Sequence, residues 1–227
     1  MSGRSLFPFV AAGAILASAA MAAPADSRRP AARSIDDPIS FRSSSGRHLP
    51  PSDGGIAGAC SGSIQTQSAN PSTIEGGASV YCGTIATSSE TWIARSFGLQ
   101  SLSTAVSCVQ FGVDENVGGA WPVEVSILIG DVAGPDALAV LGSTTTLIPA
   151  GSSGTLHTVS YPAVQIPPGS DLVIALRTPS RSLADGGDGG RLVLGFNDDG
   201  ESAPTYIKAS LCGVGDFVTT GSVGFPN

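Results

Sequence analysis

Apolar and polar residues alternate with the period of β-strands along much of this chain, most clearly in Ala105–Asp131. The later half of this segment has a branched apolar residue at every second position: Val123, Val125, Ile127 and Ile129. The earlier half places three apolar residues on one strand face: Val109, Phe111 and Val113. Between the halves, Asn116–Gly119 has the residues of a turn. The segment therefore predicts two strands joined by a Gly-rich turn.

Similar alternations recur from Ile56 to Asn227, separated by turn residues, and helix signals are nearly absent. The predicted strands are Ser79–Ile85, Thr91–Leu99, Ala105–Asp114, Pro122–Asp131, Leu138–Ile148, Thr155–Ile166, Asp171–Thr178, Arg191–Asn197, Pro204–Ala209 and Asp216–Phe225. About ten short strands at this spacing are typical of an antiparallel sandwich or barrel. We expect one all-β domain over residues 56–227, an antiparallel β-sandwich of jelly-roll type.

The first 55 residues have a different composition. Met1–Ala23 has the parts of a secretory signal peptide: Arg4, an apolar run, and a small-x-small cleavage site. The alternative is an uncleaved membrane anchor, but the apolar run is short for a span. Pro24–Gly55 is rich in Pro, Ser and Arg with few large apolar residues, which predicts a disordered linker or pro-segment. We therefore expect a secreted protein, extracellular or periplasmic, without membrane insertion after signal cleavage.

Charge and cysteine usage narrow the possible partners. The chain has a formal net charge of −7, and its domain has five basic against fourteen acidic residues, which argues against binding to nucleic acid. In an exported protein the four cysteines, Cys60, Cys82, Cys108 and Cys212, predict two disulfides, for which three pairings are open. Zinc is disfavoured, because no CxxC spacing occurs and the chain has two histidines.

From Ile64 onward the chain resembles a family of uncharacterised secreted bacterial β-sandwich modules. The residues that carry the resemblance are Asn70–Ile74, Ser79–Cys82, Trp92–Leu99, Val109–Asp114, Pro122–Ile129, Pro167–Ile174, Gly195–Gly213 and Gly224–Pro226. Such modules occur alone or appended to secreted hydrolases and surface proteins, which implies an accessory, non-catalytic role. The resemblance also implies a Cys82–Cys212 disulfide, which leaves Cys60–Cys108 as the second.

Catalytic constellations are weak in this sequence. A serine nucleophile needs a histidine base, and the one histidine of the domain, His157, reads as a surface residue of a strand, with no GxSxG elbow in the chain. A glycosidase needs two converging carboxylates. The densest carboxylate candidates are Asp114 with Glu115, and Asp198 with Asp199 and Glu201. Neighbouring residues of a strand point to opposite faces, so we expect no enzyme.

A Gly-rich acidic stretch is the best metal candidate. Calcium takes six to eight oxygen ligands, which clustered Asp, Asn and backbone carbonyls can supply. The candidate ligands are Asp185, Asp188, Asn197, Asp198, Asp199 and Glu201. Their spacing matches neither an EF-hand nor a β-roll repeat, and solvated acidic turns are the alternative interpretation.

Arg95 falls in the middle of a predicted strand, on the same face as Ile93 and Phe97. A charge buried there needs a partner. We expect a structural ion pair with Asp114 or Glu115, and an anion-binding arginine is the alternative.

Aromatic residues offer a possible surface for sugar rings. Flat aromatic side chains stack on the C–H faces of pyranoses, although buried core positions are the commoner outcome in a sandwich. Trp121, beside Gly119 and Pro122, is the first candidate for exposure, followed by Tyr206 and Trp92, ahead of Tyr81 and Tyr161.

These observations predict a secreted, non-catalytic module that binds extracellular or cell-surface polysaccharide, with calcium as a possible structural ion. The second hypothesis is a structural or protein-interaction component of the cell envelope that uses its sheet edges or acidic face. The third is a hydrolase with a carboxylate pair. An exposed aromatic strip would favour the first hypothesis, a long unprotected edge strand the second, and a cleft with two facing carboxylates the third.

Overall fold

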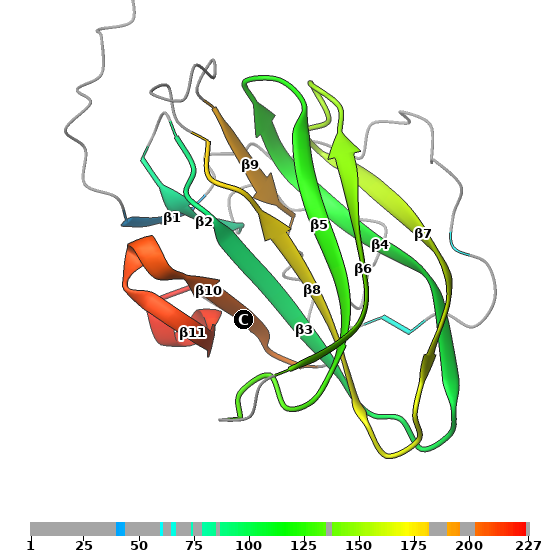
Figure 1. Cartoon of the computed structure of the whole chain (residues 1–227). Coiled ribbons are helices and arrows are strands. Elements are labelled where there is room, and N and C mark those ends of the chain that lie inside the picture. Colours follow the sequence, from blue (N-terminus) through cyan, green and yellow to red (C-terminus); the bar gives the residue numbers. More distant parts are fainter. Residues whose placement is uncertain are drawn as a thin grey trace, which may run out of the picture. The chain divides into compact units, whose positions relative to one another are not determined.

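Strands dominate the computed structural model, as the alternation predicts (Figure 1). It describes residues 40–43, 60, 65–66, 74, 79–84, 87–134, 138–181, 190–195 and 203–225, all within one compact unit, Asp36–Asn227. The strands are β1 (Ser40–Ser43), β2 (Val80–Gly83), β3 (Thr91–Leu99), β4 (Thr104–Val117), β5 (Trp121–Ile129), β6 (Ala139–Ile148), β7 (Thr155–Ile166), β8 (Asp171–Thr178), β9 (Arg191–Leu194), β10 (Thr205–Ala209) and β11 (Val214–Thr219). Two short 3₁₀ helices follow β10 and β11: η2 (Ser210–Cys212) and η3 (Thr220–Val223).

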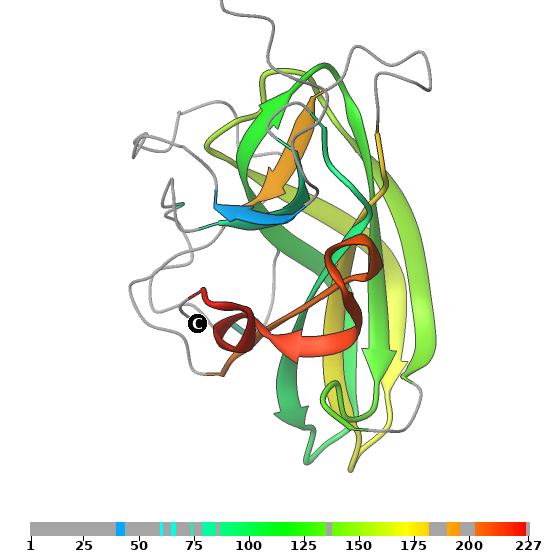
Figure 2. The same ribbon diagram turned by 90° about the vertical axis from the view of Figure 1, so that its left-hand side faces the viewer.

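The strands form three antiparallel sheets. The largest has six strands in the order β11-β10-β3-β8-β5-β6, a second has the order β7-β4-β9, and β1 pairs with β2. Figures 1 and 2 show the C-terminal segment, drawn in orange to red, along one side of the large sheet. The all-β, antiparallel, sandwich-like fold is thus confirmed, and the jelly-roll connectivity stays a prediction.

The core lies between the six-stranded and three-stranded sheets. Alternate residues of β5 point inward from one sheet and alternate residues of β4 from the other, as their spacing predicts. The central cluster includes Val109, Phe111, Val113, Trp121, Val123, Val125, Ile148, Leu192 and Ile207. Because β4 and β5 belong to different sheets, the turn at Gly118 and Gly119 carries the chain across the sandwich. Both glycines have positive φ angles, 86° and 103°, which favour glycine at this crossing.

One part of the predicted linker is ordered. Residues 40–43, expected in a disordered segment over 24–55, form β1, which pairs with β2 in antiparallel register. Phe41 packs edge-on against Phe225, with ring centroids 6.5 Å apart, and Arg42 donates from Nε to the Gly83 carbonyl at 3.2 Å. Backbone pairing and one aromatic contact therefore order this four-residue stretch, which is too short to change the composition of the predicted linker. The predicted signal peptide, residues 1–23, lies outside the described residues.

Two disulfides fasten the fold. Cys60 is bonded to Cys108 of β4, with Cα atoms 5.7 Å apart, and Cys82 of β2 to Cys212 of η2, with Cα atoms 6.0 Å apart. The second bridge joins the small sheet to the end of the large one across 130 residues of sequence. The structure thus has the pairing that the resemblance implies. No helix in the described part of the chain is long and apolar enough to cross a membrane.

Candidate functional site

A row of charged and aromatic side chains crosses the outer face of the six-stranded sheet. Strand register places five outward-facing residues side by side over β10, β3, β8, β5 and β6: Lys208, Trp92, Arg177, Glu124 and Thr145. Their strand neighbours Ile207, Ile93 and Leu176 point into the core. The period of two therefore brings these polar groups together on one surface although they are far apart in sequence.

Arg177 is the centre of this row. Its Nε and Nη2 donate to Oε2 of Glu90, at 3.0 and 2.5 Å, and its Nη1 donates to Oε2 of Glu124 at 3.1 Å. Hydrogen bonding to Arg177 lowers the pKa of Glu90, although partial burial opposes the shift. Hydrogen bonds from Arg177 to Glu90, and next to Glu124, raise the pKa of the guanidinium. The Glu90–Arg177 pair is therefore stabilised in its charged form, and the guanidinium holds both glutamate side chains in place.

Trp92 is oriented by the same pair. Its indole Nε1 donates to Oε1 of Glu90 at 3.2 Å, and the Arg177 guanidinium carbon lies 5.4 Å from the centroid of the indole ring. This distance is within the range of a cation–π interaction. One face of the partly exposed indole therefore contacts the Arg177 guanidinium, and this contact together with the hydrogen bond to Glu90 fixes the orientation of the ring.

The polar contacts continue onto β6. The Ser143 hydroxyl donates to Oε1 of Glu124 at 3.0 Å, and the Ser126 hydroxyl donates to that of Ser143 at 3.2 Å. We call the connected set the outer-face network: Glu90, Trp92, Glu124, Ser126, Ser143 and Arg177. It joins four strands of the sheet, from β3 to β6, and the segment that precedes β3.

Beside this network the sheet surface is built from small and apolar residues. Ala94 and Ala175 are buried and lie next to Tyr206, which pairs with Ala94 across β3 and β10. Phe217 of β11 and Val132 of the β5–β6 connection pack on the same cluster. The Tyr206 ring is consequently half-buried at the margin of the network.

The sequence hypothesis for aromatic residues is partly corrected. Trp92 and Tyr206 lie on one outer face, but Trp121, expected to be the most exposed, is 0% exposed in the core. Its Nε1 donates to the Val117 carbonyl at 3.2 Å, and the Arg181 guanidinium lies 5.1 Å from its ring. The flanking Gly and Pro suggested a surface turn. Trp121 nevertheless shares the inward face of β5 with Val123, and that position decides its burial.

The other two tyrosines are also largely inside. Tyr81 of β2 is buried, with the Arg191 guanidinium 5.9 Å from its ring centroid. Tyr161 donates from its hydroxyl to the Val125 carbonyl at 2.5 Å, so it spans from one sheet to the other. Neither forms a strip with Trp92 on the outer face.

Glu115 is held by a different arginine from the one predicted. We expected Arg95 to pair with Asp114 or Glu115, whereas Arg191 of the neighbouring strand β9 donates from Nε and Nη2 to the two Glu115 carboxylate oxygens. Arg95 lies in β3 of the other sheet, opposite Thr205 and Ile174. The pair of Arg95 with Asp114 stays a prediction.

His157 lies on the inner face of β7 rather than on the surface. It is half-buried opposite Phe111, with ring centroids 6.1 Å apart, and its Nε2 lies 3.0 Å from the Thr155 hydroxyl. Burial lowers the pKa of its imidazole. The surface position expected from the surrounding Gly and Ser was wrong, because His157 has the strand parity of Val159.

All six predicted calcium ligands lie outside the described residues: Asp185, Asp188, Asn197, Asp198, Asp199 and Glu201. Among the residues that the structure does describe, no group of three or more His, Cys, Asp or Glu could hold a metal ion. Calcium binding at residues 185–201 therefore stays a prediction.

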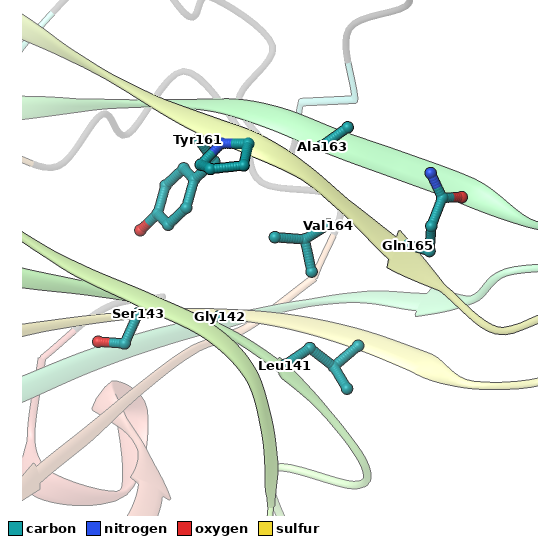
Figure 3. Close-up of a pocket in the computed structure, with 8 residues that line it drawn as sticks. Leu141, Gly142, Ser143, Tyr161, Ala163, Val164 and Gln165 are labelled. Carbon is teal, nitrogen blue, oxygen red and sulfur yellow. The ribbon is translucent and has the colours of Figure 1, made fainter.

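A second feature is an open hollow of about 410 Å³ between β6 and β7, the outer strands of the two sheets. Figure 3 shows Tyr161 and Val164 pointing from β7 toward Gly142 of β6. The lining is completed by Leu141, Ser143, Pro162, Ala163 and Gln165. It is mostly apolar, so it offers shape and contact area but few polar groups.

No local pattern in the sequence indicates the outer-face network directly. Glu124 could be assigned to the outward face of its strand, but Glu90 and Arg177 are 87 residues apart and meet only through the pairing of β3 with β8. Searches of the sequence against protein-family models and curated proteins, and of the structure against solved structures, find no match.

Proposed function

We propose that this protein is a secreted, non-catalytic module that binds extracellular or cell-surface polysaccharide through the outer face of its six-stranded sheet. The observation that carries the proposal is the outer-face network. It unites an oriented indole, a guanidinium, two carboxylates and two hydroxyls on one surface. The resemblance to accessory modules of secreted proteins points the same way.

These groups suit the chemistry of a sugar chain. A pyranose has an apolar C–H face, which stacks on an aromatic ring, and hydroxyls that both donate and accept hydrogen bonds. Trp92 supplies the ring, while Glu90 and Glu124 accept and Arg177 donates. Because the three charged side chains already fix one another, little conformational entropy is lost when a ligand binds.

The charge of the row favours a neutral polymer. Two carboxylates, Glu90 and Glu124, lie with two cations, Arg177 and Lys208, so the formal charges of these four side chains balance. The chain as a whole has a net charge of −7. An acidic polysaccharide would meet this negative field without a compensating basic patch on the row.

The electrostatics favours binding over hydrolysis. A glycosidase acid needs a carboxyl with a raised pKa, so that it is protonated when substrate is bound. At Glu90 the pKa is lowered by Arg177, which is the opposite direction. The same guanidinium bridges Glu90 and Glu124, and so occupies the space between the two carboxylates.

Export is part of the proposal. Two disulfides in the structure are compatible with an oxidising compartment, and residues 1–23 have the composition of a signal peptide. Fractionation of expressing cells, with the mature N-terminus determined by mass spectrometry, tests it. Cleavage after Ala23 and recovery outside the cytoplasm are the expected results.

Binding is tested by retention of the purified protein on a panel of insoluble polysaccharides and by affinity electrophoresis with soluble ones. We expect retention on at least one neutral polymer. Trp92→Ala should weaken that binding about tenfold or more, because buried aromatic anchors carry much of an interface energy. Arg177→Met should weaken it as well, since both glutamates lose their shared partner.

The matched control is Gln110→Ala, on the exposed face of β4 in the other sheet, which should bind as the unmodified protein does. Parallel samples with calcium and with a chelator test the calcium hypothesis at residues 185–201. Absence of retention on every polymer, or equal binding by Trp92→Ala, would contradict the proposal.

One observation favours the second candidate, a structural or protein-interaction component of the cell envelope. β6 is a ten-residue outer strand without charge or proline, and such an edge can accept another strand. Co-purification of an envelope protein that is lost on a Thr145→Lys change, together with no polysaccharide binding, would place this function first.

A further inference from the structure

The free edge of β6 lacks two of the features that usually protect an outer strand, charge and proline, and its one bulge, at Leu141, lies near the start of the strand. Its sequence, Ala139–Ile148, has no charged residue and no proline. Natural sheets commonly block such edges with lysine, proline or bulges. The other long outer strand, β7, contains Pro162, and the far edge of the large sheet, β11, contains Asp216. On β6, by contrast, Val140 is 63% and Leu147 is 64% exposed.

β7 forms no strand pair with this edge. Among the described strands β6 pairs with β5 alone, and the open hollow in Figure 3 lies between β6 and β7, with Val164 of β7 next to Gly142. Outward side chains along the regular part of β6 are exposed, whereas those facing β7 are partly covered. The backbone groups on the outer side of β6 are therefore without a strand partner in the described part of the chain.

We propose that β6 pairs with β6 of a second copy of this chain, antiparallel about a two-fold axis, so that the two large sheets become continuous. Charge argues for this occupant. Copies with a net charge of −7 repel one another, and β6 is a neutral strip along which two of them can approach. In an isologous contact β6 faces β6 of the second copy, so a charged residue near the centre of β6 would lie close to the same charged residue of the other copy.

The register follows from where β6 is regular. Its pairing with β5 runs without a break from Gly142 to Ile148, is interrupted by a bulge at Leu141, and is followed by Pro149. The centre of this stretch is Thr145. A two-fold axis there pairs the whole stretch with itself and sets Thr144 opposite Thr146 of the second copy. Cross-strand threonine pairs are favourable.

The pairing has a consequence for the outer face. Strands that pair about an axis perpendicular to the sheet keep their outward residues on the same side. Ser143 and Glu124 lie at the β6 end of the outer-face network. The networks of the two copies would then lie on one surface, and a long polymer could contact both, which increases avidity. The pairing itself does not depend on polysaccharide binding.

Sedimentation of the purified full chain across concentrations tests the proposal. The expected result is a mass that rises from one chain toward two. Thr145→Lys should weaken association at least tenfold, because each lysine would lie directly opposite its own copy, where like charges destabilise a sheet. Within one chain the new lysine would face Glu124, so the fold should be kept. Gln110→Lys adds the same charge on the exposed face of β4 and should leave association unchanged.

Cross-linking gives a second readout. The described cysteines are all in disulfides, so a Thr145→Cys variant has one new thiol at the proposed axis. Directly opposed residues of an antiparallel pair have Cα atoms about 4.5–5.5 Å apart, which lies within the range of about 4.4–6.8 Å seen for disulfides. We expect mild oxidation to give a covalent dimer with Thr145→Cys but not with Gln110→Cys. A single-chain mass at all concentrations, an unchanged dimer in Thr145→Lys, or equal cross-linking of both cysteine variants would overturn the proposal.

Discussion

The ion pair between Glu115 and Arg191 allows a stability prediction worked from its geometry. Both side chains are 17% exposed, and Arg191 contacts both carboxylate oxygens, with Nε 2.6 Å from Oε2. The guanidinium also lies 5.9 Å from the Tyr81 ring centroid. Replacing Arg191 by Met leaves a largely enclosed carboxylate without this partner. Breaking a fully buried pair costs about 3–5 kcal/mol, so we expect about 2–3 kcal/mol here.

A double variant distinguishes the energy of the Glu115–Arg191 interaction from the other effects of each substitution. Glu115→Gln combined with Arg191→Met removes both charges, and replacing both partners of a buried pair is often nearly neutral. We expect the double variant to lose less than the Arg191→Met single variant. The coupling energy of the cycle should then be about 2 kcal/mol or more.

Urea unfolding followed by circular dichroism measures these values. With a denaturant slope of about 1–3 kcal/mol/M, the single variant should lower the midpoint by roughly 0.7–3 M. Arg177→Met is the control, because that side chain is 38% exposed and exposed pairs contribute about 1 kcal/mol or less. If the double variant loses as much free energy of unfolding as the Glu115→Gln and Arg191→Met single variants together, the reasoning is refuted.

Three further predictions concern the core, the termini of the fold and alkaline pH. Trp121→Ala should lower the free energy of unfolding by about 3–5 kcal/mol, since the side chain is fully buried; an unchanged thermal midpoint would contradict its core position. Replacing Cys82 and Cys212 by Ser should cost up to about 5 kcal/mol on the loop-entropy account, measured by denaturant unfolding under non-reducing conditions. Burial, and next the charge of Glu124, raises the pKa of Tyr161 from 10.0 to about 12. The contribution of this raised pKa to the free energy of unfolding is full below pH 10 and is lost as pH rises toward 12. An ultraviolet titration of tyrosine ionisation should show a step near pH 12 that Tyr161→Phe removes, and a step that persists in this variant would contradict the prediction.

Local pattern predicts the strands of this protein well. The alternation in Pro122–Asp131 places Val123 and Glu124 on opposite faces of β5, as observed. The same rule, applied one residue earlier, would have placed Trp121 inside. Turn chemistry at Gly119 and Pro122 outweighed that rule in the sequence interpretation, and the burial of Trp121 shows that parity along the strand is the stronger signal.

The candidate site depends on long-range pairing, which a single sequence does not encode in any local pattern. Arg177 meets Glu90 because β3 and β8 are neighbours, and it meets Glu124 because β8 also pairs with β5. Likewise Glu115 meets Arg191 through the pairing of β4 with β9. Charge and spacing can nominate such residues, but strand order decides which of them become partners.

The Cys82–Cys212 bridge also determines how this domain would respond to tension. A pull applied at β1 and at the end of η3 passes through the covalent bond between Cys82 and Cys212 and bypasses the residues between them. Those 130 residues of separation, about 430–470 Å of fully extended chain, stay out of the stretched path while the bond is intact. The sheets that carry the outer-face network are then mechanically shielded. Reduction of this one bond would expose residues 109–211 to force, because the Cys60–Cys108 bridge still bypasses the residues between its own two cysteines.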